Sequence, residues 1–283
     1  MVRSLVNGQL DKLREEILSC NRCTLNRSRV NHGLWKLPGF GHPSAEVIFV
    51  AEAPSATGGC REGLYYSTTN SVFYWYLKEA GFNIPIDRLT ISALGRLSRQ
   101  EKKLEILAGR RKQPEETNEV SSNSRTNNRG VLDIELVIQD IREKRRRMMQ
   151  PIYEAFTQEL LYASDVVRCP SYDPDLDANC PLPKESIEQC LDFLLRELEI
   201  IKPKIICAMG VVATKVLTGI PNLEQARSRG IIKSSECSLK HGIDVFPTYF
   251  PTAMRPEMAK IEDLRFLRQH LGLRLGKGII CVE

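Results

Sequence analysis

Short apolar runs and longer amphipathic segments alternate along this chain. The apolar runs predict strands over residues 47–50, 160–169, 204–210 and 242–250. The amphipathic segments predict helices over residues 5–17, 71–81, 184–201, 211–217 and 257–271. Strands that alternate with helices are typical of a parallel or mostly parallel sheet covered by helices. Because the carboxyl ends of parallel strands meet at one edge of a sheet, the loops after Ala51, Val167, Met209 and Phe246 should gather there.

Residues 95–150 interrupt this alternation. The residues just before them, 89–94, are apolar enough for a short strand, and residues 113–130 are almost wholly polar, which predicts a flexible loop. Apolar residues at helical spacing then predict a helix that Pro151 should kink or restart. We therefore expect one domain over residues 1–283, with residues 95–150 as a basic, partly flexible helical insert.

The composition is that of a folded protein. With 283 residues, of which 42% are hydrophobic and 27% charged, the chain can bury a sizeable core, so disorder throughout is excluded. It holds no apolar run of the length that a membrane span needs and no recognisable signal peptide. We therefore expect a soluble, cytoplasmic protein without a membrane partner.

The net charge of +5 is concentrated in one segment. Residues 95–150 hold fourteen Lys and Arg residues against nine Asp and Glu residues, so the insert accounts for the whole positive excess. A localised excess of this kind can meet a phosphate backbone. The alternative is a charged helix surface that only faces solvent.

Nine cysteines in an intracellular chain favour metal or redox chemistry over a disulfide framework. Cys20 and Cys23 form a CxxC pair after the first predicted helix, Cys169 ends a predicted strand and Cys190 lies on a predicted helix. Four thiolates from separate segments can enclose either a zinc ion or a 4Fe-4S cluster, and their spacing does not separate the two. Cys180 competes with Cys190 as the fourth ligand.

Five motifs follow one another along the chain: CNRCTLNRSR, VIFVAEAPSATGGCREGLYYS, ASDVVRCP, PLPKESIEQCLDFLLRELEIIKPKIICAMG and PTYFPTAMRPEM. In this order they resemble the iron-sulfur uracil-DNA glycosylases, families four and five of that superfamily. The resemblance covers roughly residues 15–94 and 160–270. It implies an α/β fold, a three-layer α/β/α sandwich around a short, mostly parallel sheet. It also implies a structural 4Fe-4S cluster, in preference to zinc, on Cys20, Cys23, Cys169 and Cys190.

The activity that the resemblance implies is hydrolysis of the N-glycosidic bond of a damaged or deaminated base, uracil or a related one, in DNA repair. Such an enzyme first flips the base out of the duplex. Tyr66 stands where a family phenylalanine stacks on the flipped base, and the family pocket also takes in Ala53 and Phe250. Glu52 lies where this pocket begins. Tyr66 could equally lie in the core, and Glu52 could cap a loop.

Three positions depart from the family pattern. One is the aspartate that some family-five members place after the stacking aromatic: it aligns here near Thr69 or Asn70, and neither can act as a carboxylate base. Family four reads the uracil edge with an asparagine where this chain has Asp165, and an ionised carboxylate only accepts hydrogen bonds. Asp165 is therefore protonated in a dry pocket, or selects a base with an exocyclic amine, or positions the attacking water, or caps the loop. Phe250 replaces a histidine that donates to the departing base, and loss of one such donor commonly costs about 10²–10³ in rate. Asp165 and Glu52 remain the catalytic candidates.

DNA is the expected partner. Met254 and Arg255 occupy the loop that, in the family, pushes into the duplex and contacts phosphate, and Thr252 could donate to a phosphate. Arg145 and Arg146 of the insert would extend this basic track, unless they belong to a solvated helix face. We expect a monomer that works with chromosomal DNA.

Two other functions fit the same sequence. One is a catalytically silent iron-sulfur DNA-binding protein that recognises lesions and recruits partners through residues 95–150. The other is a zinc-stabilised α/β domain unrelated to DNA.

Overall fold

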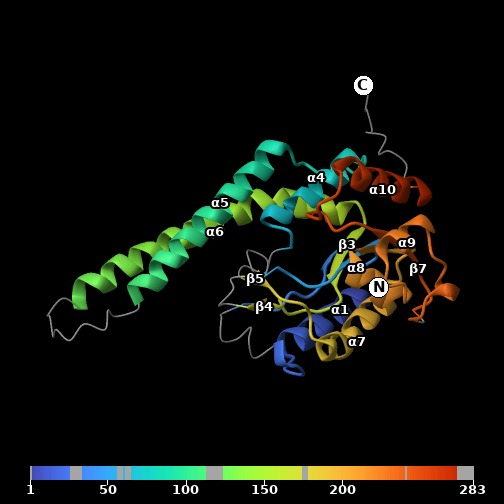
Figure 1. Ribbon diagram of the computed structural model, residues 1–283, viewed down its shortest axis with the longest axis horizontal. Coiled ribbons are helices and arrows are strands. Elements are labelled where there is room, and N and C mark those ends of the chain that lie inside the picture. Colours follow the sequence, from blue (N-terminus) through green and yellow to red (C-terminus); the bar gives the residue numbers. More distant parts are fainter. Residues whose placement is uncertain are drawn as a thin grey trace.

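The computed structural model describes residues 2–25, 34–55, 60, 65–112, 124–173, 178–239 and 241–272. Its centre is a sheet of five strands in the order β1-β3-β2-β6-β7 (Figure 1). The strands are β1 (Phe40–Gly41), β2 (Val47–Ala51), β3 (Leu161–Asp165), β6 (Ile205–Met209) and β7 (Asp244–Thr248). Only β1 runs antiparallel to its neighbour, and the other pairs are parallel. The mostly parallel sheet predicted from the sequence is therefore confirmed.

The central strands read as unbroken apolar runs because both faces of the sheet are covered. Every residue of β2, β3 and β6 is buried. Alternate residues of β2 belong to different cores: Phe49 packs in one and Ile48 in the other. Strand β1 was not predicted from the sequence, because two residues are too few to show a strand pattern.

Helices form a layer on each face of the sheet, so the three-layer α/β/α fold is confirmed (Figure 1). On the face of Ile48 lie α1 (Val2–Ser19), α7 (Lys184–Ile201), α8 (Val211–Thr218) and α9 (Leu223–Ser228). On the face of Phe49 lie α4 (Val72–Glu79), α10 (Glu257–His270) and the nearer part of the insert. A small sheet of β4 (Tyr172–Asp173) and β5 (Ala178–Asn179) stands apart. Among the described helices, none combines the length and apolar composition of a membrane span.

The insert is a pair of long helices that projects from the body (Figure 1). Helix α5 spans Arg88–Lys112 and α6 spans Ser124–Gln158. The strand predicted over residues 89–94 is wrong: these residues lie in the first turns of α5, and only Leu94 among them is buried. The polar loop is shorter than expected, because residues 124–130 are helical, while 113–123 lie outside the described residues. Helix α6 also continues through Pro151 as one element.

The insert buries one of its predicted DNA-binding residues. Arg145 is completely buried in the seam between the two helices, where its guanidinium donates to Glu101 at 2.6 Å. Glu101 also accepts from Arg142 at 2.6 Å. We therefore correct the expectation for Arg145: it holds the two helices together and has no surface to offer DNA. Arg146 lies outside the seam, half-exposed, and pairs with Glu143 at 2.8 Å.

Breaking the buried pair should destabilise the helical pair. Arg145→Ala removes a buried side chain from the seam and leaves Glu101 with Arg142 as its partner, which should lower the free energy of unfolding by about 1–3 kcal/mol. The exposed control Arg146→Ala should change it by no more than about 0.5 kcal/mol. Urea unfolding followed by circular dichroism measures both variants. Equal stability of the two variants would contradict the structural role of Arg145.

Candidate active site

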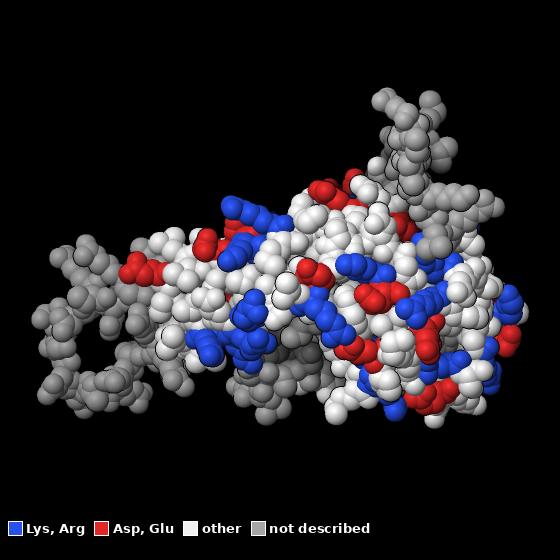
Figure 2. Space-filling view, turned by 90° about the horizontal axis from the view of Figure 1, so that it is seen from above, with Lys and Arg blue, Asp and Glu red and all other residues white. Residues whose placement is uncertain are grey.

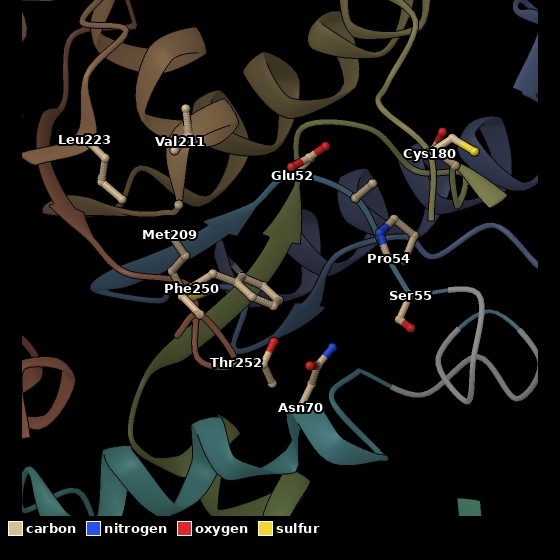
Figure 3. A pocket seen from close by; sticks show the side chains of 14 residues that line it. Glu52, Pro54, Ser55, Asn70, Cys180, Met209, Val211, Leu223, Phe250 and Thr252 are labelled. Atoms are coloured by element: carbon tan, nitrogen blue, oxygen red, sulfur yellow. The ribbon is translucent and has the colours of Figure 1, made fainter. Parts of the chain in front are cut away.

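The loops at the carboxyl edge of the sheet enclose a cavity of about 580 Å³ (Figure 3). The predicted gathering of the loops after the four parallel strands is thus confirmed. The lining residues are Glu52, Ala53, Pro54 and Ser55 after β2, Ser171 and Cys180 after β3, Met209, Gly210 and Val211 at the end of β6, Phe250, Thr252 and Ala253 after β7, and Asn70 and Leu223 from other segments.

Phe250 occupies the middle of this cavity. Figure 3 shows its ring projecting inward, with Glu52 to one side and Asn70 and Thr252 to the other. The turn between β6 and α8 lies close to it: a Cβ on Gly210 would sit 3.5 Å from the Cβ of Phe250, and Gly210 has φ of 90°, which favours glycine. Glycine at position 210 therefore allows this turn to pass close to Phe250.

A second, much smaller cavity of about 20 Å³ adjoins the first, and Phe250 and Ala53 line both. Tyr66 and Asp165 line the smaller one. This volume has room for about one water molecule and not for a base. The structure therefore brings together four of the predicted pocket residues, with Phe250 at the boundary between the two spaces.

Asp165 ends β3 with only 1% of its surface exposed. Burial raises the pKa of its carboxyl group to about 7, although attraction to Arg168 and a hydrogen bond with Tyr65 oppose the shift, and the charges of Glu197 and Glu52 add to it. Its Oδ2 atom has no hydrogen-bond partner within the described part of the chain. Near neutral pH, the carboxyl group is therefore about half protonated and has one oxygen free for a ligand.

The Tyr65 hydroxyl has two possible acceptors. It lies 3.3 Å from the carbonyl oxygen of Leu37 as well as within reach of Asp165. A hydroxyl has one proton, so it cannot donate to both acceptors. Donation to Asp165 lowers the pKa of that carboxyl group and favours its ionised form, whereas donation to Leu37 leaves Asp165 without this support.

Tyr66 belongs both to the core and to the pocket. Its ring packs 4.9 Å from that of Phe73 and is 8% exposed, and its backbone has φ of 49°, a left-handed conformation rare for a bulky residue. The hydroxyl is buried, and burial raises its pKa well above the usual value, so it remains a donor. In the described residues, the Tyr66 hydroxyl and the Ser67 Oγ find no hydrogen-bond partner. Such atoms cost free energy until a water or a ligand satisfies them.

Glu52 and Asp165 leave adjacent strands side by side. The carbonyl oxygen of Glu52 accepts from the backbone of Val167 at 3.0 Å, and Ala51 is the register partner of Asp165. The Glu52 side chain is half-buried in the larger cavity, and burial raises its pKa. The two carboxyl groups therefore line different cavities: Asp165 lines the small cavity and Glu52 lines the large one.

The structure adds Asn70 to the candidate residues. It lies in a short helical turn, η1 (Thr69–Ser71), before α4 and lines both cavities with an amide that can donate and accept. The sequence aligned Thr69 or Asn70 with a family-five aspartate, but only as residues that cannot act as a carboxylate base. The place of Asn70 beside the pocket could not be predicted, because it depends on the packing of α5 against the turn.

Three of the four predicted cysteine ligands, Cys23, Cys169 and Cys190, are buried in one apolar cluster. Burial raises the pKa of the Cys190 thiol, the backbone N–H of Arg168 lowers it, and the charges of Cys23 and Cys20 raise it, so these groups are near neighbours. Cys180 instead lines the large cavity. In the described part of the chain, no three Cys, His, Asp or Glu side chains surround a single point as the ligands of one ion would.

A buried ion pair joins the cysteine cluster to the pocket. The guanidinium of Arg168 donates to Glu197 on α7 at 2.6 Å and to the hydroxyl of Ser164 at 2.5 Å, and both charged residues are 1% exposed. Arg168 lies between Asp165 and Cys169 in the chain and influences the pKa of both Asp165 and Cys190. Removing either charge would leave the other buried and unpaired.

The predicted DNA-contact loop lies at the mouth of the large cavity. Thr252 is exposed and lines it, Met254 is fully exposed, and Arg255 is half-exposed. Lys260 of α10 donates to the carbonyl oxygens of Pro251 and Ala253 at 2.8 and 2.7 Å. The loop is therefore anchored from within and presents its side chains outward.

The profile of the Uracil DNA glycosylase superfamily matches residues 38–268. The chain belongs to this superfamily. A type-4 uracil-DNA glycosylase of Sulfurisphaera tokodaii is 26% identical over 272 residues, which cover 92% of this chain and 84% of that protein. A type-4 uracil-DNA glycosylase of Archaeoglobus fulgidus is 25% identical over 255 residues, which cover 88% of this chain and 85% of that protein. The superfamily match includes every strand of the central sheet.

The raised pKa of Asp165 predicts a distinctive pH dependence of stability. The folded protein holds this proton up to about pH 7, whereas the unfolded chain releases it near pH 3.8, so burial of the carboxylate lowers the free energy of unfolding progressively between these values. Asp165→Asn removes this contribution. Urea unfolding at pH 5, 6, 7 and 8 measures this effect. The free energy of unfolding of the variant should rise relative to that of the parent protein up to about pH 7, and the difference between the two should then stay constant. A difference independent of pH would contradict the shifted pKa.

Proposed function

We propose that this protein is a DNA glycosylase that hydrolyses the N-glycosidic bond of uracil or a related deaminated base after flipping it out of DNA. The observation that carries the proposal is the cavity at the carboxyl edge of the sheet, with buried Asp165 and its free oxygen behind it. Membership of the superfamily and the names of the two relatives support the same activity.

Protonated Asp165 takes the place of an amide in reading the base. A carboxylic acid has one O–H donor and one carbonyl acceptor, which match the O4 and N3–H groups on one edge of uracil. Because the small cavity holds about 20 Å³, the base itself lies in the larger space, with this edge toward Asp165. Tyr66 supplies ring surface and a hydroxyl at the same boundary.

Hydrolysis leaves negative charge on the base and positive charge on the sugar, and it consumes one water molecule. Glu52 lies in the large cavity, where its ionised carboxylate can accept a proton from the water and stabilise the sugar cation. Phe250 cannot donate to the departing base. Asn70 and Tyr66 are the donors that line this boundary, and they provide hydrogen bonds in place of a histidine.

Cys20, Cys23, Cys169 and Cys190 would hold a 4Fe-4S cluster. Three of them are buried in one apolar cluster and Cys20 interacts with them, which fits a closed site of four thiolates. The resemblance of the cysteine motifs to those of the iron-sulfur uracil-DNA glycosylases favours a cluster over zinc. When bound, such a group supplies a crosslink between α1, the segment after β3, and α7.

DNA would lie across the mouth of the large cavity. Thr252, Met254 and Arg255 present two polar side chains and one apolar wedge there, which suits phosphate contact and entry into the duplex. Arg146 on the projecting helices would add a phosphate contact. Figure 2 shows several basic side chains on this projection together with a few acidic ones, and both signs are interspersed over the body. We further propose that the protein acts as a monomer on chromosomal DNA.

A silent DNA-binding role is the second candidate. It is favoured by Phe250, which lacks the donor of the family histidine and separates the large cavity from Asp165. In that role the exposed loop at Met254 would still engage DNA, while no base would be released.

Base release distinguishes the two functions. Oligonucleotides with uracil, hypoxanthine, xanthine or oxidised bases, single- and double-stranded, should show release of uracil or one related base by the parent protein. Glu52→Gln should lower the rate by about 10²–10⁴, as loss of a general base does, and the exposed control Glu188→Gln should not. No release from any oligonucleotide, with DNA still bound, would favour the silent role.

The pH profile tests how Asp165 reads the base. Release of uracil by the parent protein should fall as pH rises through about 7, because the ionised carboxylate only accepts hydrogen bonds. Asp165→Asn keeps a donor and an acceptor at every pH, so its profile should lack this decline. Identical profiles for the parent protein and the variant would remove Asp165 from base reading.

Cysteine variants test the cluster. Protein purified without oxygen should contain about four iron atoms per chain. Cys169→Ser should lower the iron content and the visible absorption, and should destabilise the protein as a result. Cys237→Ser is the matched control, since Cys237 is equally buried and lies outside the ligand set. Full iron content in Cys169→Ser would exclude Cys169 as a ligand.

A further inference from the structure

Glu224 on α9 is the centre of a hydrogen-bond network at the DNA-contact loop. Its carboxylate accepts from Arg255 at 3.0 Å and from the hydroxyl of Tyr249 at 2.7 Å. A longer contact of 3.4 Å joins it to Arg227. The hydrogen bond from Tyr249 is the main cause that lowers the pKa of Glu224, followed among the favourable contributions by the charge of Arg255. Glu224 is therefore ionised at neutral pH and faces the guanidinium of Arg255.

The network has a fixed part and a movable part. Arg227 is fixed: it donates to both oxygens of Asp263 and stacks over the Tyr249 ring at 3.7 Å. Arg255 is held more loosely, at 5.5 Å from the same ring, and it and Glu224 are 53% and 51% exposed. An exposed ion pair of this kind is weak in water.

The pair spans a second opening beside the large cavity. This opening, of about 390 Å³, is lined by Glu224 and Arg255 on opposite segments, together with Met254 and Tyr249. It shares Ala253 and Leu223 with the large cavity, so the loop forms the wall between the two. Lys260 anchors the backbone of this wall, and the contact with Glu224 holds the Arg255 side chain against α9 in the free protein.

We propose that Glu224 is a positioning residue: it holds Arg255 beside α9 in the free protein and releases it to a DNA phosphate on binding. The proposal rests on the proposed DNA contact of Arg255. A phosphate accepts two parallel hydrogen bonds from a guanidinium, whereas Glu224 receives only one close contact from Arg255. Glu224 therefore competes with DNA for Arg255 and lowers the affinity of the free protein, while it keeps the Arg255 side chain in one position.

A double-mutant cycle tests this competition. Glu224→Gln, Arg255→Gln and the double variant are compared with the parent protein by fluorescence anisotropy. The probe is a duplex that contains a tetrahydrofuran abasic site, in low and moderate salt. Glu224→Gln should tighten binding about two- to fivefold at low salt, which corresponds to the free energy that an exposed ion pair contributes. In the Arg255→Gln background, the same change should have almost no effect.

Salt dependence and a control separate this role from a general charge effect. Arg255→Gln should weaken binding and reduce the slope of log affinity against log salt by about one, as loss of one phosphate contact does. Glu188→Gln removes an exposed, lysine-paired carboxylate on α7 and should leave affinity unchanged. Thermal unfolding of each variant shows whether the fold is intact.

The possible failures are distinguishable. If the parent protein binds the duplex with no dependence on salt, the proposed DNA contact itself is wrong. If the parent protein binds normally and Arg255→Gln weakens it, but Glu224→Gln has no effect or has an equal effect in both backgrounds, then Glu224 does not compete for Arg255 and the proposal is overturned.

Discussion

The ion pair of Arg168 and Glu197 connects the sheet, the cysteine cluster and the pocket. Both side chains are buried, so neither can lose its partner without leaving an uncompensated charge in the core. Glu197 also accepts from Tyr162 and from the backbone of Gly39, which brings β1 into the same network. The position of α7, and with it Cys190, is thus set relative to β3. The charge of the same guanidinium lowers the pKa of Asp165 and so opposes the rise that burial causes. The protonation state of Asp165 therefore depends on an ion pair that also holds the fold together.

Periodicity allowed much of the fold to be predicted. The four parallel strands and the helices that follow them are long enough for their apolar pattern to be read, and the rule for parallel sheets then predicted that the loops after these strands gather at one edge. The pocket roles of Glu52, Tyr66, Asp165 and Phe250 followed instead from the resemblance of their motifs to those of the iron-sulfur uracil-DNA glycosylases. The DNA-contact loop at Met254 was predicted from the same resemblance.

The remaining features depend on partners distant in the sequence. Arg145 looks like any other member of a basic run until Glu101, 44 residues earlier, is seen beside it. The apolar residues at the start of α5 are too few to separate a strand from a helix, because Leu89, Ile91 and Ala93 also alternate as they would in a strand. The pKa of Asp165 follows from burial and, besides the nearby Arg168, from groups on three segments distant in the sequence. Charge and burial of this kind are properties of the packed chain and leave no local pattern.

The projecting helices are joined to the pocket at their root. The hydroxyls of Tyr153 on α6 and Tyr74 on α4 both donate to the carbonyl oxygen of Tyr65, at 2.6 and 3.3 Å. This orients the peptide group that leads into Tyr66, whose left-handed backbone needs such support. The root of the projection is therefore part of the frame of the pocket. A chain shortened at the outer turns would keep the hydrogen bond from Tyr153, whereas a chain without the root would lose it and would have to hold Tyr66 in another way.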